Sequence, residues 1–200
     1  VLTHEYGHFL SYNASLGSNV GSERNSMDEG FGDYVAASYS KALDTYKSEW
    51  VFNWDGHNNY WNGRVVNSSK VYPTNIIPNS IYKNAEIWSA LLMSIHDDIG
   101  RVATDSLIFE AHYGYNANMS MTDGGYLLLQ ADSDLTNGHY HCQLLEHLFA
   151  RGILAYDPGN QCGISGLHQQ ALPTAGFLNN PAWFGVTNSG AEPFVITLFD

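Results

Sequence analysis

Residues 3–43 read THEYGHFLSYNASLGSNVGSERNSMDEGFGDYVAASYSKAL, and this stretch decides the fold. Residues 1–12 are predicted to form a first helix, and residues 13–25 have the Ser-, Gly- and Asn-rich composition that is typical of a loop. Ser26 is expected to cap a second helix whose first turn holds Asp28 and Glu29, where the helix dipole favours anions. The stretch therefore predicts two helices that pack antiparallel.

His4 and His8 lie four residues apart, so on a helix they share one face and can present two imidazoles to one ion. Zinc accepts nitrogen and oxygen ligands in a tetrahedron and keeps a position open for water in catalytic sites. Glu5 could take a proton from that water, whose pKa the ion lowers toward about 7. The spacing is the HExxH motif of zinc metalloproteases. The alternative is two surface histidines on a helix.

A third ligand must come from further along the chain. A metzincin would need Gly at position 11 and His at position 14, but Ser11 and Ala14 stand there. Glu29 fits better, because the 20 residues between His8 and Glu29 let one helix end and an antiparallel one return. Glu23 is the alternative, although it is expected in the polar loop. Asp33, one turn beyond Glu29, is the candidate to accept the other N–H of a ligand histidine, unless it is an exposed helical acid.

Further helices are expected where apolar residues recur at helical spacing: 82–99, 104–114, 122–135 and 141–154. The composition of residues 50–80, rich in Asn, Gly and Pro, predicts a long irregular excursion. The fold class is therefore predicted to be mainly α. We expect a helical domain at 1–156 and an irregular tail, or a linker toward a further domain, at 157–200.

Composition narrows the possible functions. The chain has 44% hydrophobic residues, enough for a sizeable core, and 8 Lys and Arg against 20 Asp and Glu, a net charge of −12. Such a surface is poorly suited to phosphate backbones, so nucleic acid is not an expected partner. No apolar run approaches the roughly 18 residues that span a bilayer. Cys142 and Cys162 could form one disulfide in an exported protein or remain two thiols.

HEYGH at 4–8 followed by MDEGFGD at 27–33 resembles the gluzincins, in which a Glu in an E-x-x-x-D segment completes HExxH. The nearest match is the fungalysin family, relatives of thermolysin. Further similar stretches are KVYP at 70–73, NAEIWSALL at 84–92 and LLLQADSDLTNGHYHCQLLEHLFARGI at 127–153. The resemblance covers roughly residues 1–155.

The resemblance implies a secreted zinc endopeptidase that acts on protein or peptide substrates, with the helical half of a thermolysin-like fold. A strand-rich N-terminal half or a propeptide would then precede Val1. Zinc would be bound by His4, His8 and Glu29. Glu5 would be the general base, and Asp33 would orient His4.

One departure from the family concerns the oxyanion. The family usually places His four residues before the Glu of its G-E-x-W segment, whereas this chain has Tyr82 before Glu86 and Ala85 in place of the Gly. A tyrosine hydroxyl can donate the same hydrogen bond to a tetrahedral oxyanion. Tyr82 is thus a candidate catalytic residue, or a packing residue.

Other interpretations stay open. A zinc aminopeptidase shares HExxH and a downstream Glu, and a degenerate peptidase fold could serve as a binding module. Arg64 could reach a substrate carbonyl or form an ordinary ion pair. The acidic pairs Asp97/Asp98 and Asp132/Asp134 could bind calcium.

Overall fold

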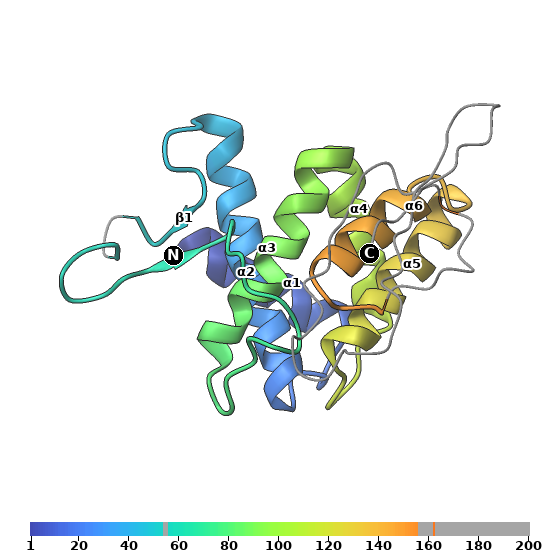
Figure 1. The fold of residues 1–200 in the computed structure, drawn as a ribbon, viewed down its shortest axis with the longest axis horizontal. Helices are drawn as coiled ribbons and strands as arrows, with labels where there is room; N and C mark the ends of the chain where they lie inside the picture. Colours follow the sequence, from blue (N-terminus) through green and yellow to red (C-terminus); the bar gives the residue numbers. More distant parts are fainter. Residues whose placement is uncertain (54–55, 156–161, 163–200) are drawn as a thin grey trace, which may run out of the picture. The chain divides into compact units, whose positions relative to one another are not determined.

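The computed structural model describes residues 1–53, 56–155 and 162. Within them the chain is mainly helical, which confirms the predicted fold class (Figure 1). The helices are α1 (Leu2–Ala14), α2 (Ser22–Leu43), α3 (Ile81–Ile99), α4 (Arg101–Tyr113), α5 (Met121–Thr136) and α6 (His141–Ala150). Two short strands, β1 (Trp50–Val51) and β2 (Arg64–Val65), pair antiparallel.

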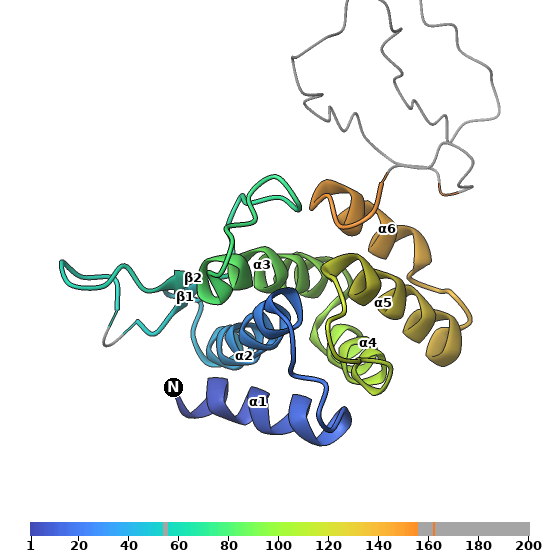
Figure 2. The same cartoon turned by 90° about the horizontal axis from the view of Figure 1, so that it is seen from below.

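Helix α3 forms the centre of the helical core. The predicted spacing is confirmed, since Ile87, Leu91 and Ile95 are all buried, and Trp88 beside them is fully buried. Helix α2 packs against α3 on one side and against α1 on the other, while α4, α5 and α6 cover the rest of α3 (Figure 2). The layer order α1, α2, α3 places the HExxH helix at the surface of the core and leaves one of its faces to solvent.

Two glycines allow α1 and α2 to approach closely. A Cβ on Gly7 would lie 2.8 Å from the Cα of Gly32, and a Cβ on Gly32 would lie 2.8 Å from the His4 ring. Real Cβ atoms do not fit at such distances, so a side chain at either position would push the helices apart. The close approach brings the imidazoles of α1 against the acidic residues of α2.

The predicted start of the second helix was wrong. Helix α2 begins at Ser22, four residues before the expected cap, and Gly21 precedes it with a φ of 99° that suits glycine. The Ser26 hydroxyl donates to the carbonyl of Ser22 inside the helix, at 2.8 Å, and caps nothing. Asp28 and Glu29 therefore lie in the second turn, and Glu23 lies in the first turn and not in a loop.

The excursion between α2 and α3 contains a small hairpin. Trp50 pairs with Val65 and Val51 with Arg64, so the chain leaves α2, turns and returns to it (Figure 1). The consequence is that Arg64, 31 residues after Asp33, comes back beside α2 with its side chain buried.

The end of the last helix also differs from its prediction. Helix α6 ends at Ala150 and not at 154. The helix ends because Gly152 takes the left-handed conformation, with a φ of 72°, and the N–H of Ile153 donates back to the Leu148 carbonyl at 2.9 Å. The Arg151 guanidinium donates to the carbonyls of Ser68 and Lys70, at 2.6 and 2.8 Å, and the Arg151 carbonyl accepts from Tyr72 N–H at 2.9 Å. Helix α5 ends at Thr136, and Asn137 after it takes the left-handed conformation.

The outer face of α1 carries exposed apolar side chains. Leu2, Tyr6, Phe9 and Leu16 are 87, 56, 59 and 73% exposed. Their spacing puts them on one side of the helix and the loop that follows, opposite the buried His4. None of the described helices is both long and apolar enough to cross a bilayer.

Both cysteines are disulfide-bonded, so neither Cys142 nor Cys162 is a free thiol. Apart from Cys162, the predicted tail at 157–200 lies outside the described residues.

A buried histidine joins α4 to α2. The Nδ1 of His112 lies 2.7 Å from the carbonyl oxygen of Ile108, and its ring lies 4.4 Å from the rings of both Phe31 and Tyr115. Burial lowers the pKa of His112 to about 4, because a charged imidazolium would lose its hydration there.

We expect His112→Phe to reduce the loss of stability in acid. Between pH 6.5 and about 4 the unfolded chain protonates this imidazole while folded His112 stays neutral. The unfolded state therefore binds more protons over this range. The free energy of unfolding then decreases as the pH falls, by roughly 3 kcal/mol for a shift of this size. Urea denaturation across this pH range measures the slope. Parallel pH dependences for wild type and variant would contradict the prediction.

Candidate metal centre

Three side chains predicted as metal ligands converge between α1 and α2. His4 Nε2 and His8 Nε2 are 3.0 Å apart. Glu29 places Oε2 at 3.4 Å from the first nitrogen and Oε1 at 3.7 Å from the second. Each of the three residues offers one potential ligand atom, and these atoms all lie within 4.8 Å of one another. It is the group of at least three His, Cys, Asp or Glu residues found at such spacing within the described part of the chain.

The distances fit one tetrahedral ion. Zinc–nitrogen bonds of about 2.0–2.1 Å at tetrahedral angles put neighbouring ligand atoms roughly 3.3 Å apart. The two nitrogens, 3.0 Å apart, lie close to this value, and each has a different Glu29 oxygen nearby, Oε2 at 3.4 Å from His4 and Oε1 at 3.7 Å from His8. One ligand atom from each of the three residues lies within 4.8 Å of the other two. Two imidazoles and one carboxylate are also the donor set of catalytic zinc sites, which keep a fourth position for water. These residues therefore fit zinc.

The other nitrogen of each imidazole faces a carboxylate from α2. Asp33, which is fully buried, places Oδ1 at 3.0 Å from His4 Nδ1, although the contact lacks the alignment of a hydrogen bond. Asp28 Oδ2 accepts a hydrogen bond from His8 Nδ1 at 2.6 Å. Both contacts leave Nε2 as the atom available to a metal.

The sequence predicted Asp33 for such a contact but missed Asp28. Asp28 and Glu29 are neighbours, so on a helix their side chains point about 100° apart. One can then reach the far side of the His8 ring while the other reaches its Nε2 edge. The adjacent Asp-Glu pair was the available signal, but Asp28 was considered only for the helix dipole.

Arg64 closes the centre from the hairpin. Its Nε and Nη2 donate to the two oxygens of Asp33 at 2.6 and 2.8 Å, and Nη2 also donates to Glu29 Oε2 at 3.2 Å. A bidentate arginine of this kind fixes the plane of the carboxylate. Of the two roles considered for Arg64, the ion pair is present.

The carboxylates determine the electrostatics of the two imidazoles. Burial lowers the pKa of His4, but Asp33 and Glu29 outweigh burial and raise it to about 9. The hydrogen bond to Asp28 raises the pKa of His8 despite burial. Burial alone would raise the pKa of Asp28, yet the His8 contact holds it below its ordinary value. An environment that stabilises a charged imidazolium also stabilises a cation between the rings.

The two predicted catalytic side chains, Glu5 and Tyr82, are both exposed. Glu5, next to His4 on α1, is exposed. Tyr82, in the first turn of α3, is 55% exposed, and its ring lies 5.3 Å from the guanidinium carbon of Arg64. Phe52 of the excursion, which the sequence interpretation overlooked, lies with its ring 5.2 Å from the His4 ring. An aromatic wall therefore flanks one side of the metal centre.

The alternative ligand Glu23 is engaged elsewhere, since its Oε2 accepts from the Met121 N–H at 2.9 Å. The acidic pairs considered for calcium separate: Asp97 contacts Lys41, and Asp98 contacts His147 at 3.1 Å. The Asp132 and Asp134 carboxylates accept from different partners, Thr136 and Gln130.

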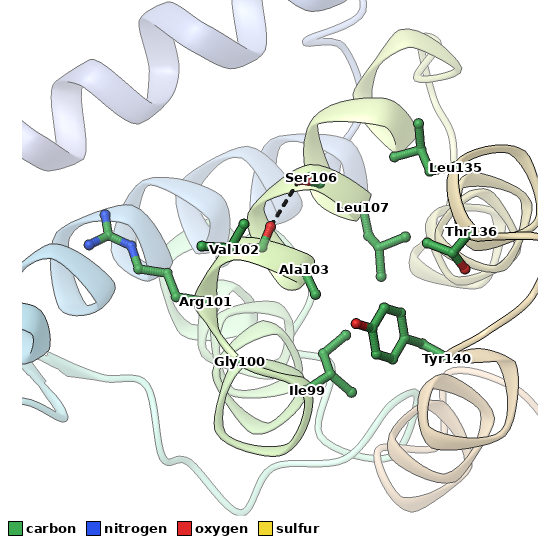
Figure 3. Close-up of a pocket in the computed structure, with 10 residues that line it drawn as sticks. All are labelled: Ile99, Gly100, Arg101, Val102, Ala103, Ser106, Leu107, Leu135, Thr136 and Tyr140. Carbon is green, nitrogen blue, oxygen red and sulfur yellow. Dashed lines mark hydrogen bonds between the residues drawn. The ribbon is translucent and has the colours of Figure 1, made fainter.

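A hollow also lies between the α3–α4 junction and the α5–α6 connection (Figure 3). Apolar side chains such as Ile99, Val102 and Leu135 line it, together with Tyr140. It contains none of the candidate metal ligands.

No protein-family model matches this sequence, and the search of curated proteins returned no significant match.

We expect Gly32→Ala to weaken zinc binding at least ~10-fold, because the added Cβ meets Nδ1 and Cε1 of His4 at 2.8 Å and displaces the ring. The overpacking should also destabilise the fold by about 1–3 kcal/mol. Competition with a chromogenic chelator measures the affinity. Gly114→Ala is the matched control, since its Cβ meets the flexible end of Leu127. Wild-type affinity in a folded Gly32→Ala variant would contradict this packing.

Proposed function

We propose that this protein is a secreted zinc-dependent endopeptidase of the gluzincin type. The observation that carries the proposal is the convergence of His4, His8 and Glu29, which bring one potential ligand atom each within 4.8 Å of the others. The HExxH spacing adds Glu5, an exposed residue on the same helix, as the candidate general base. The bonded state of Cys142 and Cys162 supports secretion, because disulfides persist in oxidising compartments.

In the proposed reaction, His4, His8 and Glu29 would hold the zinc, which would supply Lewis-acid chemistry for the scissile carbonyl and lower the pKa of the attacking water. Glu5 accepts the proton of that water and later gives it to the leaving amine. Asp28 and Asp33 hold the imidazoles of His8 and His4 with Nε2 toward the ion. The Tyr82 hydroxyl donates a hydrogen bond to the tetrahedral oxyanion, in place of the His that the family it resembles usually has there.

A second candidate is a metal-free binding module. Arg64 Nη2 lies 3.2 Å from Glu29 Oε2, so the third ligand already has a cationic partner from the protein itself. An ion pair of this kind could keep the carboxylate in place without a metal. The two candidates differ in metal content, because a binding module need not hold one zinc per chain.

We expect Glu5→Gln to retain one zinc per chain while hydrolysis of an N-terminally blocked, internally quenched peptide falls by at least about 100-fold. The amide cannot accept the proton of the attacking water, and general bases contribute roughly 100- to 10,000-fold. Glu110→Gln on α4, away from the centre, should hydrolyse as wild type. Elemental analysis and fluorescence measure the two quantities. Absence of zinc from wild type, or full activity of Glu5→Gln, would sink the proposal.

Tyr82→Phe tests the oxyanion role separately. Loss of the hydroxyl should lower kcat by about 100- to 1,000-fold with little change in KM, because the hydrogen bond forms only in the transition state. Tyr113→Phe, which removes a hydroxyl from a 71% exposed tyrosine on α4, is the control. If kcat of Tyr82→Phe equals that of the control, Tyr82 is a packing residue.

A further inference from the structure

A fully buried arginine lies behind the metal centre. Arg24, in the first turn of α2, is 0% exposed. Its Nη2 donates to the hydroxyl of Ser11 on α1 and to that of Ser18 in the connecting loop, both at 3.0 Å. The ring of Tyr115 lies beneath the guanidinium, 5.0 Å from ring centre to Cζ. The charge is thus held by α1, the connecting loop and the segment after α4.

The other terminal nitrogen of this guanidinium, Nη1, faces Asp28, which contacts the metal centre. Arg24 Nη1 lies 3.6 Å from Oδ1 of Asp28, and Oδ2 of the same carboxylate accepts from His8 Nδ1 at 2.6 Å. The carboxylate therefore accepts a hydrogen bond from the imidazole at one oxygen, and at the other it faces the guanidinium at ion-pair distance without a hydrogen bond. Arg24, Asp28 and His8 form a line that ends at the Nε2 proposed to bind zinc.

We propose that Arg24 is a positioning residue for the metal centre. It fixes the Asp28 carboxylate, and this carboxylate holds the His8 ring with Nε2 toward His4 and Glu29. The proposal rests on the metal site proposed above.

Asp28 needs the positive charge of Arg24 because its carboxylate is buried. Asp28 is buried, and a buried carboxylate without a counter-charge either moves toward water or neutralises. Either response changes the hydrogen bond to His8. The forked guanidinium is suited to this place, since one nitrogen can bind the serines while another faces the carboxylate, which a single ammonium cannot do with fixed geometry.

The alternative is that Arg24 only ties α1 to the loop through Ser11 and Ser18. The two roles differ in how Arg24 couples to Asp28. If Arg24 acts through the carboxylate, replacing Asp28 by Asn removes the need for it, because the amide oxygen of Asn still accepts from His8 and carries no charge. If Arg24 is only a tie between segments, its loss has the same effect whatever stands at position 28.

The experiment is a double-mutant cycle on zinc affinity. Wild type, Arg24→Met, Asp28→Asn and the double variant are compared by chelator competition, with Arg101→Met, at an exposed arginine, as control. We expect Arg24→Met to bind zinc at least ~10-fold more weakly than wild type, and the double variant to lie within ~3-fold of Asp28→Asn. Additive losses, or wild-type affinity in a folded Arg24→Met variant, would overturn the proposal. If Arg24→Met fails to fold, the comparison of the double variant with Asp28→Asn decides.

Two spectroscopic measurements complete the test. The visible spectrum of the Co²⁺-substituted protein should change in Arg24→Met and return in the double variant to that of Asp28→Asn. In the metal-free chain, the hydrogen-bonded His8 Nδ1–H should give a slowly exchanging, downfield NMR signal that Arg24→Met loses and Arg101→Met keeps. Because the NMR signal needs no metal, it still decides on Arg24 if wild type binds no zinc, which would refute the proposed function instead. Retention of the signal in Arg24→Met overturns the positioning role.

Discussion

The contact between α1 and α2 places two imidazoles against three carboxylates in a layer that is largely removed from water. Removing ions from water costs several kcal/mol each unless partners lie close by. Arg24 and Arg64 supply those partners, one from α2 itself and one from the hairpin. The layer can therefore exist only where helices, loop and hairpin come together, and this ties the geometry of the centre to the fold.

Glycine makes this contact possible at the level of the backbone. Where α1 crosses α2, Gly7 and Gly32 leave no room for a side chain between the two helices. The imidazole of His4 occupies the space that a Cβ on Gly32 would need. The glycines are therefore needed for the contacts between imidazoles and carboxylates, because short side chains such as Asp28 reach the imidazoles only when the two helices lie very close together.

Sequence spacing was enough to predict some of the residues of the metal centre. His4 and His8 follow from helical periodicity, and Asp33 follows from Glu29 one turn earlier on the same face. The mainly helical class and the core positions of α3 were also predictable, because periodicity is local. The start of α2 was not, since the residues 22–25 are as compatible with a helix as with a polar loop. Arg24 was missed, and an ion pair was considered for Arg64 without its partner Asp33, because a charge balance between distant segments leaves no mark in local spacing. The distance from the Tyr82 hydroxyl to a reacting oxyanion is equally beyond sequence patterns.

The exposed apolar side chains on the outer face of α1 make solubility depend on charge. At neutral pH the net charge of −12 keeps molecules apart by mutual repulsion. That repulsion vanishes near the isoelectric point of about 4.9. The apolar side chains of Leu2, Phe9 and Leu16 carry no charge, so their tendency to associate does not change with pH. We therefore expect mild acid to favour self-association through the exposed face of α1.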